Sequence, residues 1–260
     1  ISFSSMTTPI LAILRKNLLD NKNMQIIYTD ELPKFFDADV VQRVYGYKFE
    51  LKKVENAAEI SKFEGSTVLI SQDDAFATPN LTQNIDFIIG LHAELGSIII
   101  VNGNKNESYI SEIQHVRRRE TIAMTPANCL VALNLLIGQS SSHTENNPNS
   151  YREANKASVI NSIKAITGSN TKALVASSGL SMQYAIMIGL SDDALQNHKG
   201  KNIKFIVPPN CYGGTNDQAR RVAACLDNVE VVDLLVDGDN DMVQSIDTVL
   251  AQIAHEDGVP

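Results

Sequence analysis

Two short turns hold the residues of this chain whose types and spacing could bind a phosphate or a planar ring. The first turn is Ser177-Ser178-Gly179, which follows the apolar run Ala173–Ala176 and precedes a helix predicted over Ser181–Leu190. Free N–H groups at the start of that helix, together with the serine hydroxyls, would hold a phosphate. The same pattern is also typical of an ordinary strand–loop–helix cap, so both interpretations stay open.

The second turn has the sequence C-Y-G-G-T at residues 211–215 and follows the predicted strand Ile203–Val207. Its two glycines allow a ligand to approach the backbone closely, and Tyr212 offers a face on which a planar ring could stack. A plain turn is the alternative. Both turns follow strands, and ligands of α/β sheets bind beyond the carboxyl ends of the strands. We therefore expect both turns at a ligand-binding edge.

Motifs for other common chemistries are missing from the sequence. Gly200-Lys201 is followed by Asn202, where a phosphate-binding P-loop needs serine or threonine. A G-x-S-x-G nucleophile motif does not occur. The five histidines have no metal-ligand spacing, so we expect no metal site. They are His92, His115, His143, His198 and His255.

Net charge and composition argue against some classes of binding partner. The 260 residues contain 22 basic and 30 acidic side chains, and the formal net charge is −8. This balance argues against nucleic acid or an anionic membrane as the main partner. The basic run Arg117–Arg119, which we expect at a helix start, is too short to form a binding groove. No apolar run approaches the roughly 20 residues of a membrane helix.

The cysteines and the ends of the chain indicate its cellular location and its relation to a longer polypeptide. Cys129, Cys211 and Cys225 form no C-x-x-C pair, and no signal peptide precedes them. We therefore expect a reducing, cytoplasmic location. Because the chain starts at Ile1 without an initiator methionine and ends at Pro260 in I-A-H-E-D-G-V-P, we expect it to be part of a longer polypeptide.

Alternating helices and strands must position these turns. This alternation predicts an α/β fold with a mostly parallel sheet covered by helices on both faces. We expect the helix before the first turn to pack behind that sheet. The predicted helices are Thr8–Leu19, Ala127–Ile137, Glu153–Ile166, Ser181–Leu190, Asn216–Cys225 and Asp241–Ala254; the predicted strands are Met24–Tyr28, Gly65–Ser71, Gly96–Val101, Ala173–Ala176, Ile203–Val207 and Val229–Val236.

A polar segment divides the chain into two regions. Residues 139–150 contain no aliphatic side chain and no Phe, Tyr or Trp, which is typical of a linker. We therefore predict one α/β region over residues 1–138 and a second over residues 151–260.

Taken together, the motifs of the second region resemble the Cys/Met-metabolism family of pyridoxal-phosphate enzymes. The family includes cystathionine γ-synthases, cystathionine lyases and methionine γ-lyase. The resemblance covers about Ser150–Pro260 and implies the large domain of a fold-type I PLP transferase, here incomplete. The motifs come in the family's order: Tyr151-Arg152, A-L-V-A-S-S-G-L at 173–180, N-C-Y-G-G-T at 210–215, V-D-G-D-N at 236–240 and I-A-H-E-D-G-V-P at 253–260.

The resemblance assigns roles to individual residues. Ser178, Gly179 and Leu180 would bind the cofactor phosphate, and Tyr212 would stack on its pyridine ring. Tyr151, with Arg152, would reach the cofactor of a neighbouring subunit, so a homo-oligomer is implied. The family arm is Y-x-R, however, whereas Arg152 follows Tyr151 directly here. No residue of this chain can be assigned as the family's Schiff-base lysine or its ring-nitrogen aspartate in this region.

The first region resembles the same family in degenerate form. Phe3-Ser4-Ser5-Met6 is similar to the phosphate turn without its glycine, and Asp30–Pro33 has proline where the stacking tyrosine would lie. Asp74–Pro79 is similar to the motif of the ring-nitrogen aspartate, and Leu91–Gly96 places Ala93 at the lysine. A coincidentally similar α/β domain is the alternative. If the copy is real, Ser4-Ser5 should superpose near Ser177-Ser178.

The resemblance implies a pyridoxal-phosphate-dependent enzyme of the transsulfuration type. Its reaction would be elimination or replacement at the β or γ carbon of a small amino acid derived from cysteine, cystathionine or homoserine. Two alternatives remain. One is a catalytically inactive scaffold of the same fold, and the other is an unrelated α/β nucleotide-binding protein.

Overall fold

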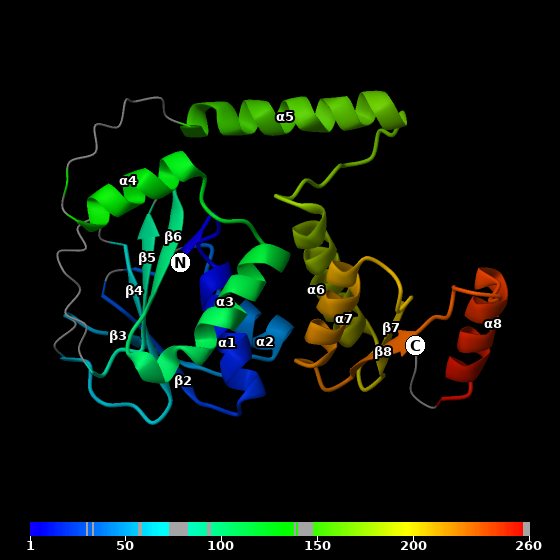
Figure 1. Cartoon of the computed structure of the whole chain (residues 1–260), viewed down its shortest axis with the longest axis horizontal. Coiled ribbons are helices and arrows are strands. Elements are labelled where there is room, and N and C mark those ends of the chain that lie inside the picture. The colour runs from blue at the N-terminus through cyan, green and yellow to red at the C-terminus, as the bar shows by residue number, and fades with distance from the viewer. Residues whose placement is uncertain are drawn as a thin grey trace.

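A computed structural model gives the fold of the chain. It describes residues 1–29, 31–32, 34–56, 59–72, 83–92, 95–137, 139 and 148–256. Two lobes lie side by side in Figure 1, each built around its own sheet. We call residues 1–137 the N-terminal lobe and residues 179–256 the C-terminal lobe. Most of the predicted linker, residues 140–147, lies outside the described residues.

The N-terminal lobe contains a six-stranded, mostly parallel sheet. Its strand order is β1-β6-β5-β4-β2-β3. Strands β3, β2, β4 and β5 run parallel to one another, whereas β6 is antiparallel to both β5 and β1. The strands are β1 (Ser2–Phe3), β2 (Met24–Tyr28), β3 (Glu50–Lys53), β4 (Ser66–Ser71), β5 (Phe87–His92) and β6 (Gly96–Val101).

Both faces of this sheet are covered, but unevenly. One face packs against α1, α2 and α3, where Ile26 and Phe87 meet Ile13 and Ile113 in one apolar core. On the other face Ile98 packs against α4, and loop residues cover the rest. The α/β class and the mostly parallel sheet are thereby confirmed. The helices are α1 (Thr8–Leu19), α2 (Ala38–Tyr45), the 3₁₀ turn η2 (Asn104–Asn106), α3 (Ser108–Arg119) and α4 (Pro126–Leu136).

The C-terminal lobe is built around a two-stranded parallel sheet, in which Phe205 of β7 pairs with Val231 of β8. Tyr184 of α6 and Val222 of α7 belong to the core on one face, and Val249 of α8 belongs to the core on the other. Its elements are α6 (Gly179–Asn197), β7 (Ile203–Val207), α7 (Gly213–Ala223), β8 (Val229–Asp233) and α8 (Met242–Ile253).

The segment before the first turn does not form the predicted strand. Residues 173–176 have no strand assignment, and Leu174 and Val175 are 73% and 46% exposed. Within the described residues no strand lies beside them. A β-branched or apolar run becomes a strand only where a partner edge supplies backbone hydrogen bonds and packing. The prediction of a strand here was therefore wrong.

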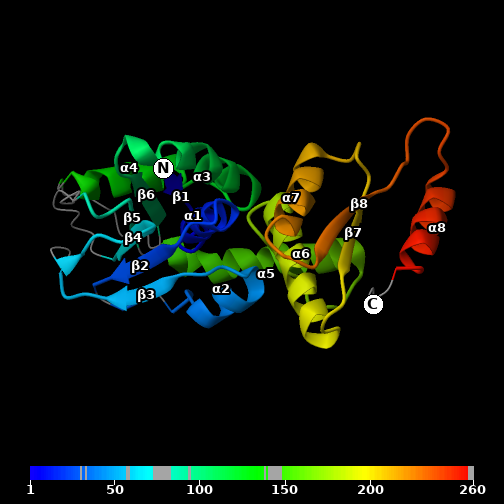
Figure 2. The ribbon, with the colours of Figure 1, turned by 90° about the horizontal axis from the view of Figure 1, so that it is seen from below.

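Two further expectations need correction. Helix α5 (Pro148–Thr167) begins inside the predicted linker and runs alongside both lobes in Figures 1 and 2. Most of its described side chains are exposed, including Ile166 at 84%, so it does not pack behind a sheet as predicted. The run Arg117–Arg119 lies in the last turn of α3, not at a helix start. There the cations face the negative end of the helix dipole.

Candidate functional site

The first turn of α6 is held by a reciprocal serine cap. Ser178 is the N-cap, and its Oγ accepts the N–H of Ser181 at 3.1 Å. The Ser181 Oγ accepts the N–H of Ser178 at 2.9 Å in return. This capping box fixes the turn because it satisfies two backbone donors that the helix itself cannot. The N–H groups of Gly179 and Leu180 have no acceptor within the described residues, so they remain available to a ligand.

The second turn leads into α7 with Tyr212 at the N-cap position. The Tyr212 carbonyl accepts the N–H of Thr215 at 2.8 Å, which starts the helix. Tyr212 is 68% exposed, so much of the residue is accessible to a ligand. The Thr215 hydroxyl donates to Oε1 of Gln183 on α6 at 2.9 Å. This hydrogen bond ties the start of α7 to the start of α6.

The two turns meet at Gly214. A Cβ atom on Gly214 would lie 2.7 Å from Cε1 of Tyr212, 2.8 Å from Nη1 of Arg119 and 3.0 Å from Cδ1 of Leu180. Two of these distances are shorter than real Cβ atoms show, so a methyl group here would push the ends of the Tyr212 and Arg119 side chains aside. The structure thus brings the predicted residues Leu180 and Tyr212 together and adds the guanidinium of Arg119.

Arg119 comes from the other lobe, and the sequence analysis did not assign it to the site. The sequence signal for it is the basic run Arg117–Arg119. No ion pair of Arg119 occurs within the described part of the chain. Its guanidinium lies close to Gly214 in the first turn of α7, and both a positive charge and a helix start favour an anion.

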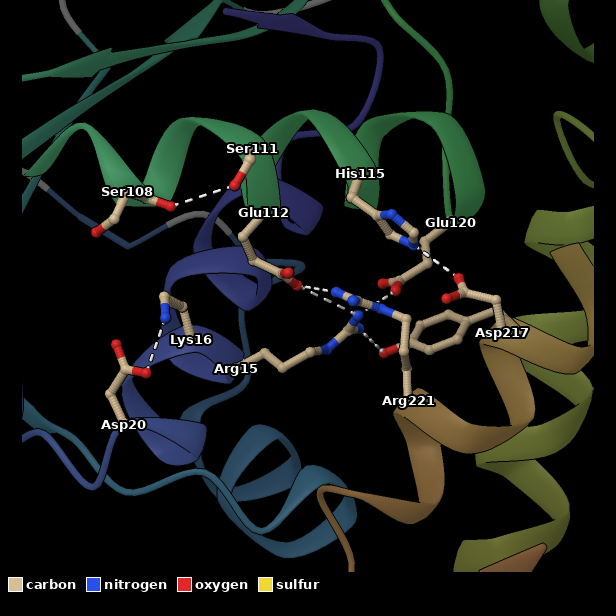
Figure 3. A network of polar contacts seen from close by, with 11 residues as sticks. Arg15, Lys16, Asp20, Ser108, Ser111, Glu112, His115, Glu120, Asp217 and Arg221 are labelled. Atoms are coloured by element: carbon tan, nitrogen blue, oxygen red, sulfur yellow. Dashed lines mark hydrogen bonds and ion pairs between the residues drawn. The ribbon is translucent and has the colours of Figure 1, made fainter.

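A network of ion pairs and hydrogen bonds joins the two lobes at the end of α3 (Figure 3). Arg15 of α1 donates to Glu120 at 2.5 Å, and both side chains are 2% exposed. Arg15 also donates to the Tyr184 hydroxyl of α6 at 3.1 Å. Arg221 of α7 pairs with Glu112 of α3. Because these contacts join α1 and α3 to α6 and α7, the lobes form one packed interface.

The charges of this network are coupled. Burial alone would lower the pKa of Arg15, but Tyr47, Tyr184 and Glu120 raise it well above its ordinary value. Burial, and then the negative charge of Glu120, raises the pKa of Tyr184 well above its ordinary value. Arg15 therefore stays charged and Tyr184 stays neutral.

Several predicted residues fall outside the described part of the chain. Tyr151 and Arg152 belong to α5, but their side chains are not described, so the predicted contact between subunits stays a prediction. The N-terminal motif residues Asp74, Ala93 and Pro33 lie outside the described residues, so their assigned places in the family motifs also stay predictions. The described hydrogen bonds of the two turns include no lysine.

The comparisons with known proteins add no family assignment. No protein-family model matches the chain, and a search of curated proteins finds no match either. In the part of the chain that the structure describes, no three His, Cys, Asp or Glu residues are grouped so that they could hold a metal. None of the described helices is both long and apolar enough to cross a membrane.

Proposed function

We propose that the chain binds pyridoxal 5′-phosphate between the first turns of α6 and α7. The observation that carries this proposal is the meeting of Tyr212, Leu180 and Arg119 around Gly214. A phosphate needs donors and positive charge, and a pyridine ring needs a flat apolar face. The site offers both of these within one small region.

The residues fit the phosphate of this cofactor. Ser178, Gly179 and Leu180 would surround it, with the N–H groups of the last two as donors, while the Ser178 hydroxyl donates to Ser181 Oγ and holds the turn in shape. Arg119 would neutralise part of its charge, which a helix start alone does not do. In a Y-x-R arm the arginine would supply this charge, and we propose that Arg119 takes its place.

The residues also fit the ring. Tyr212 is exposed enough to stack on a pyridine, and stacked aromatic pairs contribute about 1 kcal/mol beyond burial. When bound, the cofactor supplies an electron sink for elimination or replacement at the β or γ carbon of an amino acid. The part of this chain is to orient the ring and anchor the phosphate. We propose a small amino acid of the cysteine, cystathionine or homoserine type as substrate, a homo-oligomer as the assembly and the cytoplasm as the location.

A second candidate is a catalytically inactive scaffold of the same fold. It is favoured by the absence of lysine from the described contacts of the two turns. Lys204 of the C-terminal lobe, for example, is held by Glu230 and Glu256 at 2.6 Å each. Chemistry at an amino-acid α carbon needs an amine that holds the aldehyde and moves a proton. We therefore expect residues 1–260 alone to bind the cofactor without turnover.

We also propose that the N-terminal lobe is a degenerate copy of the C-terminal one. The order α1–β2–α2–β3 is the same as α6–β7–α7–β8, and each pair of strands is parallel and adjacent. A serine precedes each first helix: Ser5 Oγ accepts the N–H of Thr8 at 3.1 Å, as Ser178 does for Ser181.

The test is cofactor binding by a Tyr212→Ala variant, with Tyr28→Ala of β2 as the matched tyrosine control. Titration with pyridoxal phosphate, followed by absorbance and by phosphorus NMR, measures ring and phosphate separately. We expect Tyr212→Ala to weaken binding roughly fivefold, from about 1 kcal/mol of stacking. Tyr28→Ala should leave affinity unchanged in the folded protein. Equal affinity of the two variants, or no binding by the wild type, contradicts the proposal.

A further inference from the structure

One buried glutamine connects the three elements of the site. Gln218 lies on α7, one helical turn after Gly214, and is 1% exposed. Its Nε2 donates to the carbonyl of Leu180 at 2.9 Å and to the carbonyl of Arg119 at 3.1 Å. One amide nitrogen thus bridges the first turn of α6 and the last turn of α3.

The geometry explains why an amide is needed at this position. The Arg119 carbonyl is among the last four of α3, which have no donor within their own helix. A carboxamide supplies two N–H donors from one neutral atom, whereas lysine would bring a charge into a buried place. Methionine has the same length but no donor.

The buried amide oxygen of Gln218 is energetically unfavourable. Its Oε1 is buried and has no hydrogen-bond partner within the described residues. An unsatisfied buried acceptor is unfavourable, so a leucine or methionine would avoid this cost. A glutamine is therefore explained by what its two N–H groups hold together, not by packing alone.

We infer that Gln218 is a positioning residue for anion binding at the two turns. By holding the Arg119 and Leu180 carbonyls at a fixed spacing, it keeps the end of α3, which carries the Arg119 side chain, beside the first turn of α6, so that both can act on one phosphate. This inference rests on the proposed function for the identity of the ligand. The spacing itself can be measured without any ligand.

The first experiment compares Gln218→Met with Gln25→Met in the full 260-residue chain. Gln25 is also a buried glutamine, and its Nε2 donates to Thr67 Oγ1 at 2.8 Å in the N-terminal sheet. Hydrogen exchange followed by mass spectrometry reports the amides at the start of α6 and the end of α3. We expect Gln218→Met to exchange about tenfold faster at both places, because two hydrogen bonds are lost. Gln25→Met should not change them.

The second experiment measures binding of inorganic sulfate and of pyridoxal phosphate. Gln218→Met should bind both about tenfold more weakly than the wild type. Gln218→Glu gives a pH test: its carboxylate repels the two carbonyls, whereas its protonated form donates one hydrogen bond. Sulfate keeps its charge between about pH 5 and pH 8. Its affinity for Gln218→Glu, relative to the wild type, should therefore rise as the pH falls.

The outcomes separate the two proposals. If the wild type binds neither sulfate nor pyridoxal phosphate but Gln218→Met alone loosens both helix ends, the positioning role stands and the proposed function fails. Unchanged exchange in Gln218→Met would overturn the positioning role. It would also be overturned if Gln25→Met loosened the same helix ends equally, or if Gln218→Glu showed no pH dependence relative to the wild type in a protein that binds sulfate.

Discussion

The two lobes contain the same order of helices and strands but differ in the size of their sheets and in the presence of the candidate site. In the N-terminal lobe β2 has a parallel neighbour on each side, β3 and β4, within a six-stranded sheet. In the C-terminal lobe β7 pairs only with β8 within the described residues. The N-terminal lobe is therefore the larger body of buried apolar surface, and the C-terminal lobe carries the candidate site.

The segments before the two serine turns show what a strand requires. Ser2–Phe3 precedes Ser4-Ser5 and pairs with β6, and Phe3 is 0% exposed. Residues 173–176 precede Ser177-Ser178 and are more apolar, yet they form no strand. The difference is the partner: β6 offers an edge and a packed surface, and no described strand does so for residues 173–176. Strand formation therefore depends on tertiary neighbours more than on composition.

The turns that follow β2 and β7 differ as well. In the N-terminal lobe Asp37 caps α2, and its carboxylate accepts the N–H of Val40 at 3.0 Å. In the C-terminal lobe Tyr212 and two glycines occupy the start of α7. An aspartate at a helix start places a negative charge where an anion would bind, whereas the first turn of α7 has no acidic side chain and Gly213 has open space around it. This difference confines the proposed anion site to the C-terminal lobe.

The largest expected effect tests the contrast between the segments before the serine turns. Phe3→Ala removes a fully buried ring and should lower the free energy of unfolding by about 3–5 kcal/mol. Leu174→Ala removes a side chain that is 73% exposed and should change it by less than about 0.5 kcal/mol. Urea denaturation measures both variants. Similar losses would mean that residues 173–176 are packed after all.

A loss of similar size should follow from breaking the interface between the lobes. Arg15→Met leaves the Glu120 carboxylate buried without its cation, which costs about 3–5 kcal/mol. Lys16→Met breaks the neighbouring exposed pair with Asp20 and should cost no more than about 0.5 kcal/mol. Urea unfolding compares the two variants. A small effect of Arg15→Met would show that the lobes fold independently of this network.

An intermediate effect should distinguish the two neighbouring glycines of the second turn. Gly214→Ala places a methyl group against Tyr212, Arg119 and Leu180, so we expect a loss of about 1–3 kcal/mol and weaker phosphate binding. Gly213→Ala meets nothing within 4 Å and should be close to neutral. Thermal unfolding and phosphate titration check both variants. Equal behaviour of the two would contradict the crowded geometry at Gly214.

The smallest effect compares Ser178, the N-cap of α6, with Ser5, which lies two residues before the N-cap Thr7 of α1. Ser5→Ala and Ser178→Ala each remove an acceptor for a first-turn N–H and should each cost about 1 kcal/mol. Only Ser178→Ala should also weaken phosphate binding, since only that helix start faces Arg119 and the Gly214 turn. Loss of phosphate affinity in Ser5→Ala would place an anion site in both lobes.

Local patterns in the sequence predicted many of the elements. The predicted bounds of α1, β2, β6 and β7 agree with the structure, because apolar spacing and flanking turn residues lie within each segment. Strand β3 escaped prediction because its four residues are exposed at the sheet edge. Helix α3 escaped because only a narrow stripe of it is buried, at Tyr109, Ile113 and Val116.

The candidate site likewise contains some features that the sequence predicts and others that depend on tertiary contacts. The sequence by itself determined the serine cap of α6 and the glycine turn of α7, since each depends on neighbours along the chain. Only the tertiary structure decided that Arg119 and Gln218 belong with them, because the end of α3 reaches these turns through a packed interface between lobes. Residues 173–176 show the opposite situation. Their composition favours a strand, but they form none because a strand needs a partner edge. Contacts between distant segments depend on how whole faces pack, and no local pattern encodes that.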